Sequence, residues 1–445
     1  MTRWRSNGFG RRDFLRYSAA TGLAASAASR LATPALAAGS EVNFATWSAA
    51  VDLVQSHAHA FEQKTGIKVN YTNTPWAQYR EALITQFIGG APIDTLWVSD
   101  SWLPEWADAG WIVPVDEFEE LMKYNDDASA FCNESMMYDG RQYGVTYYTD
   151  FMGFMYDEAK LEEAGISGPP ETWQDVVEQS LIIKEKGISE FPLMLALAQE
   201  TWLIEFLSAL VFSHGGRFVN DEGTAVMQDE KGGAVEALRW VVDAVHQHQI
   251  VSPGCVEVGE LTGVKAFASG NHAFALEPKY RMRLMNDPEQ SQIAGRAKQI
   301  LMPAGPSGSH ATVGWMRFYG MTPQAYNDPQ RAADTVKLIE WFGGKADGEY
   351  LFQKLLFMDI GAGFGVKPLF EDPEIRETYN AYNNVEVVEQ QQELAQKKDV
   401  ISAWFGEWME SNGALWQQAI LQQKTPEEAM GESGEIWDDL REELG

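Results

Sequence analysis

The sequence predicts an α/β fold, because short apolar strands alternate with amphipathic helices along most of the chain. The clearest example runs from Phe61 to Phe118, where Gly66 ends a helix. Ile67, Val69 and Tyr71 then alternate with polar residues, as the residues of a half-buried strand do. A second observation is the length of 445 residues, which is too long for one hydrophobic core and suits two lobes.

Further elements carry their own local signals. Thr172 is a candidate N-cap with Asp175 three residues later, a capping-box spacing that opens a helix. Another helix starts at Asp328-Pro329 and ends at Gly343-Gly344. Strands are expected over Glu41–Thr46, Thr95–Val98, Tyr143–Thr149 and Ala273–Leu276, and helices over Ala50–Thr65 and Val235–Gln249.

The N-terminal residues have the pattern of an export signal. A twin-arginine pattern begins at Arg11-Arg12, an alanine-rich stretch follows, and Ala35-Leu36-Ala37 has the spacing of a cleavage site. No cysteine lies near that site, so no lipid anchor is expected, and no later segment reaches the roughly 18 apolar residues of a membrane span. We therefore predict a twin-arginine signal peptide over residues 1–37 and a periplasmic mature protein.

The chain is strongly acidic. It has 34 Lys and Arg residues against 64 Asp and Glu residues, a formal net charge of −30. Such a surface repels nucleic acid and anionic membranes, so we expect no nucleic-acid partner. The same charge disfavours an anionic ligand unless local arginines override the overall field.

Two cysteines, Cys132 and Cys255, leave two interpretations open. In an oxidising compartment they can form a disulfide, or both can be buried free thiols. Neither belongs to a C-x-x-C motif, so the sequence supports neither redox catalysis nor a structural zinc site.

Motifs of catalysis and of cofactor binding are missing from the sequence. It has no G-x-S-x-G, no H-E-x-x-H, no Walker loop and no G-x-G-x-x-G after a strand. The pairs His57/His59 and His246/His248 are two residues apart on expected helices, so their members face different sides and cannot chelate one metal ion. We predict no catalytic residue, no cofactor and no metal, although 64 acidic residues leave a glycosidase carboxylate pair open.

Aromatic and acidic residues at strand ends are candidates for ligand contact, because ligands of open α/β sheets bind at the carboxyl ends of strands. Trp47 ends the first strand, and Trp76 follows the second with Tyr79 one turn later. Asp100 follows the third strand and can either bind a ligand or cap the next helix. Trp97, inside that strand, is interpreted as a core residue. Aromatic rings suit the C–H faces of a sugar, and carboxylates suit its hydroxyls.

The run from Phe61 to Phe118 resembles the solute-binding proteins of sugar-importing ABC transporters, the maltose-binding-like family. It reads FEQKTGIKV, PWAQYREALITQF and GGAPIDTLWVSDSWLPEWADAGWIVPVDEF. The resemblance covers essentially the whole mature chain and is strongest over 61–118 and 143–180. It implies a two-lobed periplasmic binding protein fold of type II, with discontinuous lobes joined by hinge segments. We expect lobe 1 over 41–147 and 312–361, and lobe 2 over 148–311 and 362–445.

The resemblance also implies ligand contacts at individual positions. Asp100 in WVSD and Asp150 in TYYTD match acidic positions of the family, and Trp202 in QETW aligns with a stacking residue. Tyr280 in ALEPKY stands where the family has a Trp, and Glu277-Pro278-Lys279 precedes it in place of the usual glycine of the family. The expected ligand-binding residues are Trp47, Trp76, Tyr79, Asp100, Asp150, Trp202, Glu277, Tyr280, Arg281, Trp315, Arg317, Phe364 and Trp404.

The function implied by the resemblance is that of a monomeric periplasmic receptor. It would capture a neutral carbohydrate or polyol in the interlobe cleft and deliver it to an inner-membrane ABC permease. Two alternatives stay open. Arg281 and Arg317 are either salt-bridge residues or the mark of an anionic solute such as a glycerol-phosphate-like compound. The other alternative is a secreted carbohydrate-active enzyme that uses a carboxylate pair.

Overall fold

The computed structural model describes residues 40–200, 202–229 and 232–444. The expected signal peptide over 1–37 lies outside the described residues. Within them, no helix is both long and apolar enough to cross a membrane.

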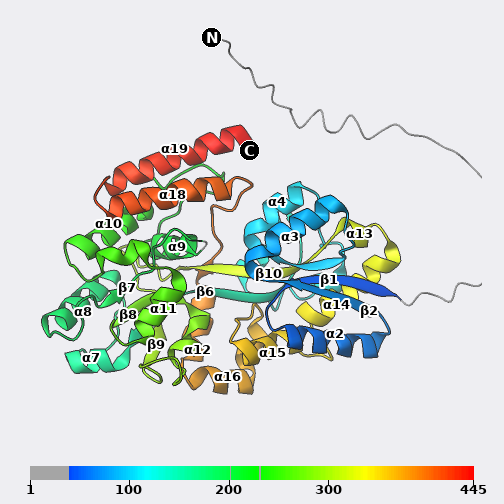
Figure 1. Ribbon diagram of the computed structural model, residues 1–445, viewed down its shortest axis with the longest axis horizontal. Coiled ribbons are helices and arrows are strands. Elements are labelled where there is room, and N and C mark those ends of the chain that lie inside the picture. Colours follow the sequence, from blue (N-terminus) through cyan, green and yellow to red (C-terminus); the bar gives the residue numbers. More distant parts are fainter. Residues whose placement is uncertain (1–39, 201, 230–231, 445) are drawn as a thin grey trace, which may run out of the picture. The chain divides into compact units, whose positions relative to one another are not determined.

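A mixed sheet organises the described chain (Figure 1). Nine strands follow the order β2-β1-β3-β10-β6-β8-β7, with β11 beside β10 and β9 beside β6, and β4 and β5 form a separate hairpin. The strands are β1 (Glu41–Trp47), β2 (Lys68–Thr74), β3 (Thr95–Ser99), β4 (Met137–Tyr138), β5 (Arg141–Gln142), β6 (Val145–Asp157), β7 (Leu193–Met194), β8 (Phe274–Pro278), β9 (Ala297–Ile300), β10 (Thr312–Met321) and β11 (Ala395–Gln396). Strand β1 pairs in parallel with β2 and β3, whereas β10 runs antiparallel to β3 and β6.

Helices connect most of these strands, which confirms the α/β class. In the first half of the chain they are α2 (Val51–Thr65), α3 (Trp76–Gly89), α4 (Leu103–Asp108), α5 (Glu119–Met122), α6 (Ala130–Ser135), α7 (Glu158–Ala164), α8 (Trp173–Glu185) and α9 (Leu203–Ser213). Later come α10 (Gly233–His246), α11 (Glu260–Ala268), α12 (Met282–Met285), α13 (Pro323–Tyr326), α14 (Pro329–Gly343), α15 (Leu351–Ile360), α16 (Pro373–Asn380), α17 (Val385–Glu393), α18 (Phe405–Ile420) and α19 (Pro426–Leu444).

The local signals of the sequence are realised in these helices. The predicted capping box opens α8, since the Thr172 side chain accepts from the amide of Asp175 and the Asp175 carboxylate accepts from the amide of Thr172. Asp328 caps α14 as expected, and that helix ends before Gly344. Gly66 ends α2 with a positive φ of 74°, a conformation that glycine adopts without strain.

Two large hydrophobic clusters form the core. The first surrounds β1, β3 and α14, and the second surrounds β8, α9 and α10, while a smaller third cluster lies around α11 and α12. Strands β6 and β10 lie in the middle of the molecule in Figure 1, and each contributes residues to both large clusters. On β6 the change falls between Phe151 and Met152, and on β10 it falls between Trp315 and Met316.

The chain passes between the two large clusters a third time. This passage lies later in the sequence than the expected lobe boundary at residue 361. Residues from Ala362 to Ala395 still pack in the first cluster, and Val400 is the next residue that packs in the second. Phe364 shows the reason, because its ring packs against Phe357 and Phe370 of the first cluster. The division into lobes stays a prediction, and this packing favours a boundary between 395 and 400.

Both cysteines are buried free thiols. Cys132 packs in the first large cluster and Cys255 in the second, so they are not paired with each other. Burial raises the pKa of each thiol to about 12, which keeps both protonated and unreactive at neutral pH.

Candidate functional site

A cavity of about 340 Å³ lies where the two large clusters meet. It receives side chains from β1, β3, β6 and β10, from the segments before α9 and after β8, and from α15. Its lining residues are Trp47, Ala49, Trp76, Trp97, Tyr147, Tyr148, Trp202, Tyr280, Trp315, Arg317, Leu356, Ile360 and Ala362.

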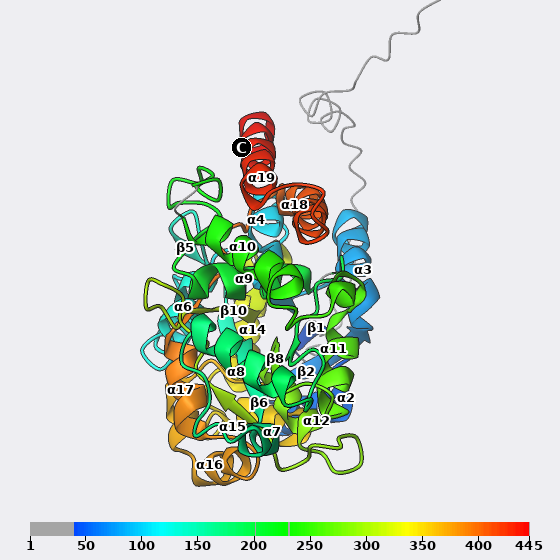
Figure 2. The same ribbon diagram turned by 90° about the vertical axis from the view of Figure 1, so that its left-hand side faces the viewer.

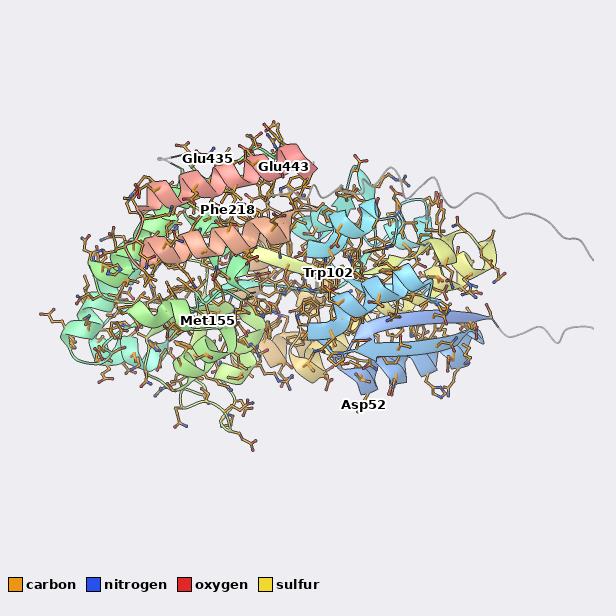
Figure 3. All side chains as sticks on the ribbon, turned by 45° about the horizontal axis from the view of Figure 1, so that its top comes forward. Asp52, Trp102, Met155, Phe218, Glu435 and Glu443 are labelled. Carbon is orange, nitrogen blue, oxygen red and sulfur yellow. The ribbon has the colours of Figure 1, made fainter. Side chains whose placement is uncertain are left out.

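The first wall of the cavity is a set of contacting aromatic rings. Trp97 stacks on Tyr147 with ring centroids 4.4 Å apart and an interplanar angle of 16°. Trp47 meets Trp97 edge-on at 4.9 Å and Trp76 edge-on at 5.0 Å. Trp76 in turn stacks on Trp102, which is labelled in Figure 3, at 5.3 Å. These mutual contacts fix the ring orientations before any ligand arrives.

The second wall comes from the second cluster. Trp315 is fully buried in β10 and meets Trp202 edge-on at 5.3 Å, and the Tyr280 ring lies 6.3 Å from Trp202. The indole Nε1 of Trp315 donates to the hydroxyl of Tyr148 at 3.3 Å. This bond leaves the Tyr148 hydroxyl hydrogen free to donate.

A β-bulge brings two neighbouring tyrosines to the same cavity. Arg317 on β10 pairs with Tyr148 on β6, and the next residue, Phe318, pairs with Thr146. Tyr147 is therefore the extra residue of the bulge. Consecutive residues of a regular strand face opposite sides, so the bulge explains how both Tyr147 and Tyr148 line the cavity.

Arg317 is the charged side chain among the lining residues. Its guanidinium carbon lies 5.4 Å from the Trp76 ring centroid, a cation–π distance. Its Nη1 donates to Asp100 Oδ1 at 3.0 Å and to the carbonyl of Met316 at 2.8 Å. Within the described chain these bonds use only Nη1, so Nε and Nη2 are available to a ligand.

Asp100 belongs to a buried charge network behind the cavity. Lys398 Nζ lies 3.6 Å from Asp100 Oδ2 and donates to Glu205 Oε1 at 3.3 Å. Burial opposes ionisation of Asp100, but the charges of Lys398 and Arg317 outweigh it and hold the pKa of Asp100 below its usual range. Asp100 is thus an ionised partner of Arg317 and does not line the cavity.

Tyr79, Arg281 and Glu277 were also expected to contact the ligand, but they do not line the cavity. Other residues bind the first two, and protein atoms cover the third. The Tyr79 hydroxyl donates to the carbonyls of Ala45 and Trp97. Arg281 forms a bidentate pair with Glu260, with bonds of 2.5 and 2.8 Å.

Glu277 is fully buried, and neither of its carboxyl oxygens has a hydrogen-bond partner among the described residues. Burial, and after it the charge of Glu260, raises the pKa of Glu277 well above its usual range. Glu277 is therefore a buried acid that does not line the cavity.

Asp150, Phe364 and Trp404 also lie apart from the cavity. Asp150 is buried beside Lys279, with Oδ2 3.4 Å from Nζ, and burial raises the pKa of Asp150 to about 6. Phe364 packs in the first cluster, and Trp404 contacts Trp437 on α19 at 5.6 Å. The structure thus gathers six of the thirteen expected residues around one cavity, namely Trp47, Trp76, Trp202, Tyr280, Trp315 and Arg317.

Sequence reasoning missed several lining residues. Trp97 was interpreted as core, and it is both fully buried and part of the lining. Tyr147 and Tyr148 stand in TYYTD, close to Asp150, but only the bulge makes both of them face the cavity. Nothing in the sequence indicated that Leu356 and Ile360 of α15 would line the cavity.

Comparisons with known proteins agree with this architecture. The family model described as bacterial extracellular solute-binding protein matches residues 38–316. A Brucella abortus (strain 2308) protein described as a binding protein is 23% identical over 256 residues, and this match covers 57% of the present chain. The chain spans 60% of the length of that relative.

Solved structures of similar fold cover nearly the whole described chain. The sugar-binding protein MalE from Xanthomonas citri matches with a TM-score of 0.75 at 19% identity, over 90% of this chain and 97% of its own. A solute-binding protein from Agrobacterium radiobacter K84 in complex with ribitol matches with a TM-score of 0.72 at 16% identity, over 90% and 99% of the two chains. At these identities the likeness shows the two-lobed fold. The family match over residues 38–316 establishes that the chain belongs to the bacterial extracellular solute-binding protein family.

Proposed function

We propose that the aromatic cavity binds a neutral sugar or polyol, and that the protein is the substrate-binding component of an ABC importer. The observation that carries this proposal is the lining itself, in which eight Trp and Tyr side chains surround one arginine. Aromatic rings cover the C–H faces of a sugar, while Arg317 and Tyr148 offer hydrogen-bond donors to its hydroxyls. The structural relatives named above support the same ligand class, since one is a sugar-binding protein and another holds ribitol.

The electrostatics of the cavity favour a neutral ligand over an anionic one. Arg317 is paired with Asp100, so its charge is already balanced. Arg281, the other arginine of the anionic alternative, is bound to Glu260 and does not reach the lining. A phosphorylated solute would therefore have only a partly neutralised arginine to compensate its charge.

The lining also favours a receptor over an enzyme. None of the described residues that line the cavity carries a carboxyl group, so the lining holds no pair of acids for glycoside hydrolysis. The proposed role is capture and release, with closure of the two lobes about β6, β10 and the segment 395–400 and delivery to an inner-membrane permease. Lobes that follow the two large hydrophobic clusters would be consistent with this motion.

The size of the cavity favours a small ligand. Its volume of about 340 Å³ lies at the lower end of the range of about 300–1,000 Å³ for small-molecule pockets. We propose a monosaccharide, a short oligosaccharide or a polyol. The twin-arginine pattern supports export to the periplasm, and we propose that the receptor acts there as a monomer.

A ligand screen by thermal shift tests the proposal. The panel contains mono- and disaccharides, polyols and the phosphorylated forms of the same compounds. A ligand at 100 times its Kd stabilises the protein by about 2.7 kcal/mol, so the transition temperature should rise with the concentration of one neutral compound class. Stabilisation only by phosphorylated compounds would overturn the proposed preference for neutral ligands. Turnover of a stabilising glycoside would overturn the proposed role as a receptor.

A further inference from the structure

A second cavity, of about 410 Å³, lies in the second half of the chain, between α8, α10 and the end of α9. It shares no lining residue with the aromatic cavity described above. Figure 2 looks onto the face that carries α8 and α10. The proposed uptake function makes no use of this cavity.

The cavity has a fixed aromatic base. Trp173 is buried, and its ring stacks on the imidazole of His214 at 5.8 Å and contacts the Trp240 ring at 4.6 Å. The indole Nε1 of Trp173 donates to the hydroxyl of Ser213 at 2.9 Å. The base is therefore held in place by the protein itself.

Two carboxylates are among the polar groups that line the cavity. Glu236 and Asp243 lie seven residues apart on one face of α10, on either side of Trp240. Neither carboxylate has a hydrogen bond or an ion pair among the described residues. The indole Nε1 of Trp240 is buried and has no hydrogen-bond partner among the described residues.

His214 adds a third acceptor. Its Nδ1 lies 2.7 Å from the carbonyl oxygen of Leu210, which can only accept, so Nδ1 carries the hydrogen and Nε2 is an acceptor. Burial lowers the pKa of His214 to about 4, against the effect of that backbone bond, and the ring is neutral at pH 7. The side chain is nine-tenths buried, and in the described chain its Nε2 has no partner.

Arg239 also lines the cavity. Its Nη2 is paired with Glu427 on α19, so the charge of this guanidinium is already balanced. Two carboxylates and one imidazole nitrogen are thus left without a donor. A ligand that satisfies them must carry several N–H groups and positive charge.

We propose that this cavity binds a linear aliphatic diamine in its doubly protonated form. Seven residues of helix separate the two carboxylates by about 10 Å along the axis. The hydrogen bond between each carboxylate and an ammonium group can run across the axis or partly along it, so the two nitrogens lie about 5–8 Å apart, the span of a chain of about three to five methylene groups. The Trp240 ring lies between the carboxylates and covers the methylene chain. The net charge of −30 raises the local concentration of such cations.

Isothermal titration calorimetry with 1,4-diaminobutane on the whole protein tests this assignment, with n-butylamine as the matched monoamine. We expect the diamine to bind at least tenfold more tightly than butylamine, because only the diamine reaches both carboxylates. Glu236→Gln and Asp243→Asn should each weaken diamine binding about tenfold and reduce the advantage over butylamine. Sugar or polyol binding in the aromatic cavity should be unchanged in both variants.

The control is Glu443→Gln, which removes one exposed carboxylate from α19 (Figure 3). It should leave diamine binding unchanged. Equal affinity for the diamine and the monoamine would overturn the proposal, as would equal losses in Glu443→Gln and Glu236→Gln. Competition between the diamine and a sugar would also overturn it, because it would place the diamine in the aromatic cavity.

Discussion

Arg317 and Asp100 form an ion pair of 3.0 Å that joins β10 to the carboxyl end of β3 at the edge of the aromatic cavity. Arg317 lines the cavity, while Asp100 lies behind it and also faces Lys398. The pair thus orients the charged donor of the proposed ligand site. Lys398 and Glu205 connect it to the second cluster through α9.

The Asp100–Arg317 pair should be important for stability. We expect Asp100→Asn to lower the free energy of unfolding by about 3 kcal/mol, because it leaves the charges of Arg317 and Lys398 buried without their partner. Urea denaturation measures the change. The control is Asp116→Asn, which breaks an exposed pair with Arg141 and should cost much less. Equal losses of unfolding free energy in the two variants would show that the buried pair contributes no more to stability than the exposed pair.

Trp202 should contribute directly to ligand affinity. Its ring lines the cavity between Trp315 and Tyr280, and we expect Trp202→Ala to weaken sugar or polyol binding about tenfold, or about 1.4 kcal/mol. Titration calorimetry with the ligand found by the screen measures it. Trp404→Ala is the control, since Trp404 packs on Trp437 outside the cavity. A loss of affinity in Trp404→Ala alone would place the site elsewhere.

Asp399 should make the stability depend on pH in a defined direction. Burial, opposed by bonds from the amides of Phe218 and Val219, raises the pKa of Asp399 from near 4 to about 6. The folded state therefore holds this proton more tightly than the unfolded state. The resulting stabilisation is complete below about pH 4 and is lost as the pH rises through about 6.

The measurement compares the unfolding free energy of the wild type with that of Asp399→Asn between pH 4 and pH 7. Relative to the variant, the wild type should lose up to about 3 kcal/mol across that window and remain constant above it. The comparison cancels the contributions of other carboxylates. A difference that is flat, or that rises with pH, contradicts the assignment.

Gly363 should tolerate no side chain. A Cβ at this position would overlap the carbonyl oxygen of Thr149 on β6, and Thr149 is held in the sheet. We expect Gly363→Ala to lower the unfolding free energy by about 2 kcal/mol or more and to weaken ligand binding, since Ala362 lines the cavity. Gly406→Ala on α18 is the control, because its Cβ would meet no atom within 4 Å and alanine favours a helix. Similar losses in both variants would contradict the steric argument.

Much of the fold could be predicted from local sequence patterns. The capping box at Thr172, the helix from Pro329 to Gly343 and the end of α2 at Gly66 depend on neighbouring residues, and all three are confirmed. The position of the third passage between the clusters depends on the packing of Phe364 with residues such as Phe370. The residues next to Phe364 in the sequence do not indicate on which side of the boundary its ring packs.

The sequence by itself determined the α/β class, the acidic surface, the export pattern and the strand-end positions of Trp47 and Trp76, because each follows from composition or local periodicity. Only the tertiary structure decided which polar side chains line the cavity and can reach a ligand. Asp100, Arg281 and Arg317 were all candidates, and all three form ion pairs in the fold, but only Arg317 also lines the cavity. Pairing partners of a charge can lie hundreds of residues away, so the availability of a side chain to a ligand is a property of the fold.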